Sequence, residues 1–246
     1  MKSIIIANWK CNPNSLKEAK KLFSEVNKKA KAKNTDVVVC APFVYLGLLK
    51  GKNLGAQNVC FEEKGAFTGE VSTLMLKDLG VEYVIIGHSE RRKYFNENNL
   101  DINKKIKILL EAKLKPILCI GETKQEFEAH LKPEVIETQL TEALKDIKKE
   151  DVKNVIIVYE PVWAISSNGG ENCSVDETMT SVVFIRKIIS ELYNRDTSDI
   201  VKVLYGGSVN SFNSADYIKN ARVDGLLVGA SSLDLEEFSL IVKSVE

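Results

Sequence analysis

The sequence lacks an excess of charge of either sign: lysine and arginine total 34, aspartate and glutamate total 34, and the net charge is +0. Nucleic acids and membrane surfaces favour strongly basic partners, so we expect the chain to bind neither. A few local donors could still hold a small anion. The sequence also lacks any apolar stretch long enough to span a membrane as a helix, which needs roughly 18 residues or more.

The five cysteines include no Cys-x-x-Cys pair, and their number is odd. A disulfide framework is therefore not expected, and a reducing, cytoplasmic location is the better interpretation. The apolar run near the N-terminus spans only a few residues, too few for a signal peptide. Because 44% of the 246 residues are hydrophobic, the chain can bury a large core, and disorder is excluded as its main state.

Short apolar runs rich in β-branched residues recur along the chain. They occupy residues 3–8, 36–41, 53–58, 82–87, 115–121, 154–160, 200–207 and 224–229. Most of them are continuously apolar rather than alternating, which predicts strands buried on both faces, as in a parallel sheet. The third run is weak and depends on the repeating pattern for support.

The intervals between these runs have helical periodicity. Apolar residues recur at spacings of three and four from Leu16 to Ala30, and Ser15 with Glu18 predicts a capping box before them. Further helices are expected over 99–113, 134–148, 174–194 and 235–245. Strand and helix alternating eight times predicts an α/β fold, a (β/α)₈ barrel of eight parallel strands with outer helices. A doubly wound open sheet is the alternative. No linker or composition shift divides the chain, so we expect one domain over 1–246.

Ionisable residues lie at the ends of the predicted strands, where barrels of this kind have their active sites. Lys10 follows the first strand and could present fixed positive charge to an anion. His88 lies at an apparent helix start, where the helix N-terminus would lower its pKa and keep a neutral imidazole. Glu160 ends the sixth strand, where burial would raise its pKa toward that of a general base. Taken singly, Lys10 could instead be a solvated surface lysine, His88 a hydrogen-bonded core histidine, and Glu160 part of a structural ion pair.

Small residues end the last two strands. At Gly206-Gly207-Ser208 and Gly229-Ala230, backbone N–H groups could approach an anion, as in the phosphate sites that follow strands seven and eight of such barrels. A base, an electrophile, a cation and an anion site together suggest proton transfer beside the carbonyl of a small phosphorylated sugar. His130, the other histidine, lies in a polar helical stretch and is interpreted as a surface residue.

The sequence resembles the triosephosphate isomerase family along essentially its whole length. The stretches that carry the resemblance are ANWKCN (7–12), GAQNV (55–59), GAFTGEVS (65–72), IIGHSERR (85–92), LCIGET (118–123), YEPVWAI (159–165), YGGSVN (205–210) and DGLLVGASSL (224–233). GHSERR, YEPVWAI and YGGSV in this order and spacing are highly specific for the family.

The resemblance implies an isomerase that interconverts dihydroxyacetone phosphate and D-glyceraldehyde 3-phosphate through an enediolate, in glycolysis and gluconeogenesis, without metal or cofactor. It implies that Glu160 is the base and that His88 polarises the carbonyl and shuttles protons. Lys10 would hold the substrate with Asn8 beside it, and Glu90 would organise Lys10 and His88. The phosphate would meet backbone N–H groups at Ser166, Ser208, Gly229 and Ala230. The loop from Gly65 to Glu70 resembles the family's dimer loop, with Thr68 reaching toward the partner's site, so a homodimer is expected.

The segment after Glu160 departs from the family pattern. The family's lid usually continues AI-G-T-G-K-[TS]-A, whereas this chain reads AISSNGGENCS, about two residues longer, with no lysine and with Ser166 where glycine is usual. Residues that resemble the lid's partners are present: Trp163 and Glu122, Tyr205 and Ser208. We expect a working lid with altered kinetics, since serine at a positive φ costs roughly 1–2 kcal/mol. Ala230, where the family often has glycine, is expected to be tolerated.

Two other functions remain open at this stage. The longer lid makes conceivable a related isomerase that acts on another small sugar phosphate. A barrel of this kind could also bind phosphorylated metabolites, or act as an interaction scaffold, without catalysis. Retention of Lys10, His88 and Glu160 together argues against the second alternative, because binding alone does not require a base.

Overall fold

The computed structural model describes residues 2–165 and 172–245. Its strands form a closed barrel in sequence order, and every neighbouring pair is parallel. They are β1 (Ser3–Asn8), β2 (Thr35–Cys40), β3 (Leu54–Ala56), β4 (Val81–Ile86), β5 (Lys115–Ile120), β6 (Ile156–Tyr159), β7 (Lys202–Tyr205) and β8 (Gly225–Val228). All eight predicted strands are present, and the weak third run is the shortest. Because β1 pairs with β8, the barrel is confirmed and the open sheet is excluded.

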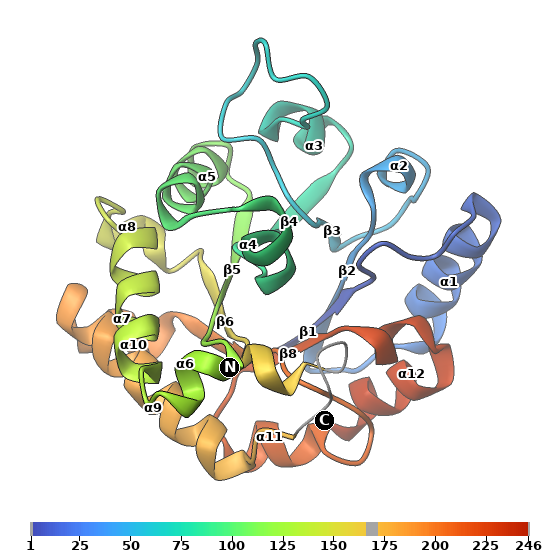
Figure 1. Ribbon diagram of the computed structural model, residues 1–246. Helices are drawn as coiled ribbons and strands as arrows, with labels where there is room; N and C mark the ends of the chain where they lie inside the picture. Colours follow the sequence, from blue (N-terminus) through green and yellow to red (C-terminus); the bar gives the residue numbers. More distant parts are fainter. Residues whose placement is uncertain (1, 166–171, 246) are drawn as a thin grey trace.

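The helices surround the barrel (Figure 1). They are α1 (Leu16–Lys29), α2 (Phe43–Leu46), α3 (Thr73–Asp78), α4 (Ser89–Phe95), α5 (Asn99–Glu111), α6 (Lys124–Glu128), α7 (Lys132–Ala143), α8 (Lys149–Val152), α9 (Val175–Leu192), α10 (Arg195–Ile200), α11 (Ser214–Asn220) and α12 (Leu235–Ser244), with 3₁₀ turns η1 (Val162–Ala164) and η3 (Ala230–Leu233). The helix predicted over 134–148 ends earlier, at Ala143, and Asp146 has φ 61, which is incompatible with a helix interior.

Hydrogen bonds from side chains fix where several helices begin. The Ser15 hydroxyl accepts a hydrogen bond from the Glu18 N–H at 3.3 Å, which confirms the predicted cap of α1. A complete capping box also needs the N3 side chain to accept the N-cap N–H. Both bonds are present at α6, between Thr123 and Glu126, whereas α1 shows only the first. The start of α4 is capped by a histidine, His88, whose imidazole accepts the Glu90 N–H. The onset of α4 is therefore built into the candidate site.

The core has two parts because the strands are buried on both faces. Alternate strand residues, such as Ile4, Ile6 and Ile85, point into the barrel and fill it together with Val158. The residues between them pack outward against the apolar faces of the helices, as Ile5 does. This arrangement confirms the interpretation of the continuously apolar runs, and it leaves only the strand ends available for chemistry.

Two further sequence predictions can be compared with the structure. All five cysteines, which lie in the described part of the chain, are free thiols. None of the helices among residues 2–165 and 172–245 combines the length and hydrophobicity needed to cross a bilayer. His130 is exposed, as expected for a surface histidine.

Candidate active site

A pocket of about 270 Å³ opens at the carboxyl ends of the strands. Its walls include side chains or backbone from the ends of five strands, namely Asn8, Lys10, His88, Glu160, Gly206, Gly207, Gly229 and Ala230. The fold therefore brings together most of the site residues that the sequence predicted, although they are far apart along the chain. Ser166 lies outside the described residues.

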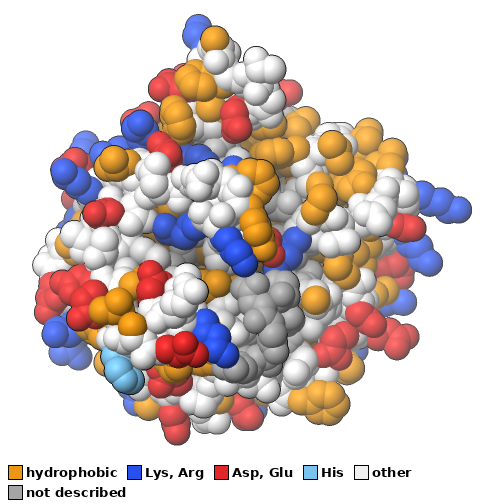
Figure 2. Space-filling view, viewed as in Figure 1, with side chains coloured by type: hydrophobic (Ala, Val, Ile, Leu, Met, Phe, Trp, Pro, Cys, Tyr) orange, Lys and Arg blue, Asp and Glu red, His pale blue; other side chains and the backbone are white. Residues whose placement is uncertain are grey.

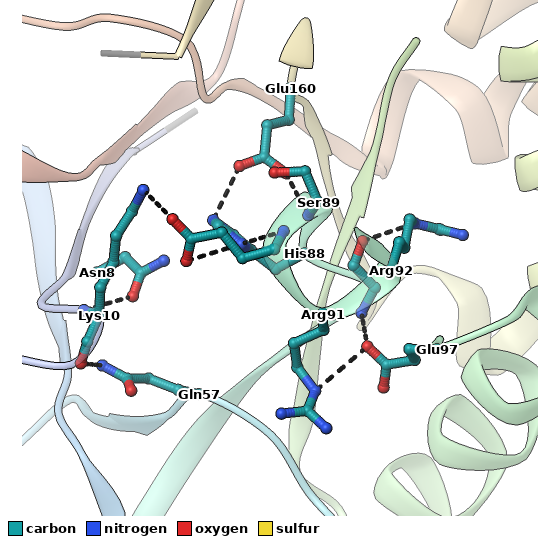
Figure 3. Close-up of polar contacts among 11 residues, drawn as sticks. Asn8, Lys10, Gln57, His88, Ser89, Arg91, Arg92, Glu97 and Glu160 are labelled. Carbon is teal, nitrogen blue, oxygen red and sulfur yellow. Dashed lines mark hydrogen bonds and ion pairs between the residues drawn. The ribbon is translucent and has the colours of Figure 1, made fainter. Parts of the chain in front are cut away.

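Glu160 and His88 form a direct, buried pair at the floor of this site. His88 Nε2 lies 2.9 Å from Glu160 Oε1, and the Ser89 N–H donates to Glu160 Oε2 at 3.0 Å (Figure 3). Glu160 is 2% exposed and His88 5% exposed. Both carboxylate oxygens thus have a donor, which is what a carboxylate needs if it is to remain charged away from water.

The pKa shifts of this pair differ from the sequence expectation. Burial alone would raise the pKa of Glu160, but the neighbouring His88 and the Ser89 N–H outweigh it and lower the pKa below its ordinary value. Burial alone would lower the pKa of His88, but the Glu160 carboxylate raises it. The predictions of a raised Glu160 and a lowered His88 pKa were wrong for this arrangement, because they treated each residue separately.

The other imidazole nitrogen of His88 defines its neutral tautomer. Nδ1 accepts the backbone N–H of Glu90 at 3.3 Å, so a neutral ring carries its proton on Nε2. The Glu90 carboxylate lies on the same side, with Oε2 3.6 Å from Nδ1. Its other oxygen accepts from Lys10 Nζ at 2.6 Å. Glu90 therefore lies between Lys10 and His88, as the sequence analysis expected.

Lys10 is held in an unusual backbone conformation at the pocket edge. Its φ is 52, a left-handed value that few residues other than glycine adopt. The Asn8 side chain accepts the Lys10 N–H at 3.0 Å, and Gln57 Nε2 donates to the Lys10 carbonyl and to the Cys40 carbonyl, both at 2.9 Å. Sequence reasoning did not single out Gln57; its place in the matching stretch GAQNV was the only signal.

A second network supports the turn that ends β4. Arg92 Nε donates to the Gly87 carbonyl at 2.7 Å, and its Nη2 donates to the Cys119 carbonyl at 3.3 Å. The Gly87 N–H donates to Glu97 Oε2 at 3.3 Å. Glu97 is itself paired with the buried Lys105. These residues fix the backbone immediately before His88, and the sequence analysis assigned none of them a role.

The loops after β7 and β8 form the small-residue wall of the pocket. The Ser208 N–H donates to the Ala164 carbonyl at 3.0 Å. An anion that binds this N–H would have to take the place of the Ala164 carbonyl as its hydrogen-bond acceptor. Ser231, to which the sequence analysis gave no role, donates from its hydroxyl to the Val209 carbonyl at 2.7 Å and joins the two loops. Gly229 lies beside the Lys10 side chain, since a Cβ added there would be 3.6 Å from Lys10 Cε.

Glu122 pairs with Trp163, as the resemblance implied. Trp163 Nε1 donates to Glu122 Oε1 at 2.8 Å, and the Tyr159 hydroxyl donates to the same oxygen at 3.0 Å. Burial raises the pKa of Glu122 above its ordinary value. The pair joins the turn after β5 to η1, which begins two residues after Glu160. It therefore fixes the backbone that follows Glu160.

A buried carboxylate and imidazole facing a pocket beside an ammonium group, at the carboxyl ends of a (β/α)₈ barrel, define an enzyme of the general acid–base type. The family model described as triosephosphate isomerase matches residues 3–245. Relatives called triosephosphate isomerase include those of Alkaliphilus oremlandii at 46% identity, Caldanaerobacter subterraneus subsp. tengcongensis at 44% and Clostridium botulinum at 42%. Between 97% and 98% of this chain and 98% of each relative are covered. The chain belongs to the triosephosphate isomerase family.

Proposed function

We infer that this chain interconverts dihydroxyacetone phosphate and D-glyceraldehyde 3-phosphate by proton transfer through an enediolate. The observation that carries the inference is the buried pair of Glu160 and His88, 2.9 Å apart and facing a pocket edged by Lys10. A carboxylate can take a carbon-bound proton while an adjacent imidazole polarises the carbonyl. The names of the relatives support the choice of substrate.

Glu160 is the base in this proposal, and its strength depends on where it points. Paired with His88 and the Ser89 N–H, its pKa is lowered and it is a weak base. A substrate entering the pocket would compete for the same donors. When the carboxylate turns from them to the substrate, burial remains and acts in the opposite direction, raising the pKa toward that of an effective base.

His88 changes character in the same step. Without the Glu160 carboxylate beside it, burial lowers the pKa of His88 and favours the neutral ring. The Glu90 N–H at Nδ1 then keeps the proton on Nε2, which faces the pocket. A neutral imidazole in this tautomer can donate to one enediolate oxygen and then the other. Lys10, held by Glu90 Oε1, adds positive charge where the oxygens become anionic.

The phosphate group is proposed to bind along the wall formed by the loops after β7 and β8. Gly229 and Ala230 line the pocket there, and Ala230 begins η3. Small residues permit backbone N–H groups to approach phosphate oxygens closely. Ser208 would join them after releasing Ala164, and Ser166 stays a prediction from the family pattern. Lys10 lies next to Gly229 and supplies charge to the same region.

The test is a coupled assay of isomerisation with glyceraldehyde 3-phosphate. We expect high kcat/KM for the wild type and a fall of about 10²–10⁴-fold in Glu160→Gln, which removes the base and keeps the size of the side chain, with one acceptor oxygen replaced by an NH2 group. Glu111→Gln, an exposed carboxylate at the end of α5, is the matched control and should retain wild-type activity. Equal activity of the two variants would refute the role of Glu160.

The alternatives predict different results in the same assay. A related isomerase would leave triose phosphates unchanged but act on another small sugar phosphate offered in their place. A binding-only barrel would bind inorganic phosphate and show no turnover of any of them. A folded wild-type protein without triosephosphate turnover would therefore overturn the proposal and direct attention to these two.

We also propose a homodimer formed through the loop from Gly65 to Glu70, which projects from the barrel between β3 and α3 (Figure 1). Each of its residues is exposed. Large hydrophobic side chains are exposed in the loop (Phe67), in and just after α2 (Val44, Leu48) and in α3 (Leu74, Met75). Figure 2 shows hydrophobic side chains gathered on this part of the surface. Such a face favours burial against a second copy. Light scattering of the wild type at micromolar concentration should give twice the chain mass, and a monomer would refute this.

The proposal includes one domain and a cytoplasmic location. Free rather than paired cysteines favour a reducing compartment. A single cooperative unfolding transition, observed equally by far-UV circular dichroism and by tryptophan fluorescence, is expected for one domain. Two separated transitions would contradict it.

A further inference from the structure

Tyr205 supports the glycine turn that lines the pocket. It ends β7, and the chain then continues through Gly206 and Gly207, which both border the pocket. A Cβ added to Gly207 would lie only 2.5 Å from Cζ of Tyr205 and 3.1 Å from Cε2. The phenol ring therefore packs directly under the backbone of this turn. Any shift of the ring must be accommodated by the turn, because carbon atoms do not approach much below 3.5 Å.

Tyr217, from α11, lies against the other side of that ring. The two ring centroids are 4.0 Å apart at an interplanar angle of 24°. Tyr217 is 2% exposed and Tyr205 is fully buried. Stacking of this kind fixes the ring plane of Tyr205, and burial leaves neither hydroxyl free to exchange its partner for water.

The hydroxyl of Tyr217 connects two segments of the site. It donates to the carbonyl of Cys173 at 2.6 Å and lies 3.3 Å from the Tyr205 hydroxyl. A phenol has one hydrogen to donate, and a carbonyl can only accept. The hydrogen between the two phenols must therefore come from Tyr205. The result is a directed chain from Tyr205 through Tyr217 to Cys173, in which each bond strengthens the next.

Cys173 anchors the far end of this chain. It precedes Ser174, the N-cap of α9, whose side chain accepts the Glu177 N–H at 3.1 Å. Cys173 is itself fully buried, and its thiol lies 3.4 Å from the Thr178 hydroxyl. The start of α9 is thus a fixed point. Through Tyr217 it holds the ring of Tyr205, and through that ring it holds the turn at the pocket wall.

We propose that Tyr217 is a positioning residue for phosphate binding: its hydroxyl joins the start of α9 to Tyr205 and so holds the 206–208 turn in the conformation that receives the anion. This rests on the proposed function. A purely apolar side chain could fill the same space, but it would leave the Cys173 carbonyl without this donor and the Tyr205 hydroxyl without this acceptor. Tyr217 does not line the pocket, so its effect falls on affinity and not on proton transfer.

The test is Tyr217→Phe, which keeps the ring and its stacking and removes only the hydroxyl. Inorganic phosphate is the probe, and its Kd is measured by calorimetry alongside KM and kcat for glyceraldehyde 3-phosphate. We expect Kd and KM to rise about three- to ten-fold, because both hydrogen bonds of the hydroxyl are lost and part of that free energy is felt at the turn, while kcat stays within about twofold.

Tyr193→Phe is the matched control. Its hydroxyl lies 3.1 Å from the Ile147 carbonyl and 3.3 Å from the Leu144 carbonyl, which share its one hydrogen, away from the pocket. We expect it to lower Tm without changing Kd or KM. The same pattern in Tyr217→Phe would mean a purely structural role and would overturn the proposal. A fall in kcat with unchanged Kd would overturn it as well.

A measurement on the wild type covers the case in which Tyr217→Phe does not fold. Hydrogen exchange of amides from 172 to 177 should slow when inorganic phosphate saturates the site, and identical exchange would refute the connection. Phosphate binding needs no turnover. Suppose that the wild type shows no turnover but that the phosphate Kd is higher in Tyr217→Phe than in the wild type. This result would contradict the proposed function and would support the role of Tyr217. A wild type that binds no phosphate would overturn both.

Discussion

Gly121, which follows β5, packs against the backbone of Glu160, the proposed base, and does not line the pocket. A Cβ added there would overlap the Glu160 carbonyl oxygen and lie only 2.6 Å from its carbonyl carbon. Nonbonded carbon atoms pack at roughly 3.5–4.0 Å, so in Gly121→Ala the two backbone segments must separate by about 1 Å. Neither can yield easily, because the Glu160 N–H donates to the Ile120 carbonyl at 2.7 Å and Gln139 accepts the Gly121 N–H at 2.8 Å.

The displacement should act mainly on catalysis. A base moved by about 1 Å is expected to lose about 10²-fold in rate, whereas overpacking of this kind costs about 1–3 kcal/mol of stability. We therefore expect kcat/KM of Gly121→Ala to fall about 10²-fold in the coupled assay, chiefly through kcat. Circular dichroism should show a folded protein with a lowered Tm.

Gly80→Ala separates displacement of the base from general destabilisation. Gly80 has φ 77, a left-handed value that costs alanine about 1–2 kcal/mol, yet a Cβ there meets no atom within 4 Å. It lies between α3 and β4, and its substitution should lower Tm without changing kcat/KM. If Gly121→Ala retains kcat/KM within about twofold of the wild type, the reasoning is wrong.

Four further results are expected. In NMR titrations, with the exposed second histidine as internal reference, the pKa of His88 should be lower in Glu160→Gln than in the wild type, because the carboxylate that chiefly opposes burial is then gone and only that of Glu90 remains; an unchanged or higher pKa would contradict the pairing. Since the pKa of His88 is raised and that of Glu160 lowered, the pair should stabilise the fold between those two values. This stabilisation is lost as pH rises through the His88 pKa or falls through the Glu160 pKa. Gln57→Leu removes the donor to the Lys10 carbonyl and to a second carbonyl on β2, so chemical denaturation should show a loss of about 1–3 kcal/mol, with a raised KM; wild-type stability and KM would show that Gln57 does not position Lys10. At pH 8, Ellman's reagent should label at most Cys11 in the folded protein, because the other four thiols are buried; rapid labelling of a second thiol would contradict that burial.

Much of the fold was readable from local pattern. Continuous apolar runs such as 82–87 and 154–160 cannot be exposed on either face, and their alternation with amphipathic segments leaves few architectures. Boundaries were less secure, since the segment 144–148 continues the pattern of α7 while Asp146 takes a left-handed φ. Periodicity records which face is apolar, but backbone conformation at a helix end depends on what the next segment packs against.

The residues of the candidate site also fall into two groups, those that the sequence could predict and those that it could not. Its residue types and their places at strand ends follow from the sequence, so His88, Glu160 and Lys10 could be named before the structure was known. Gln57 and Tyr217 could not, because their contribution is a hydrogen bond to a distant backbone carbonyl. Nothing in the residue type marks such a contact, and only the packed chain brings the two groups together.

The sequence by itself determined the family, the eight-stranded alternation and the chemical groups available at the strand ends. Only the tertiary structure decided their electrostatic state. An isolated buried carboxylate has a raised pKa and a histidine at a helix start a lowered one, yet barrel closure places these two groups 2.9 Å apart and reverses both directions. Coulombic interaction varies with distance and burial, which are properties of the folded chain and not of residue order.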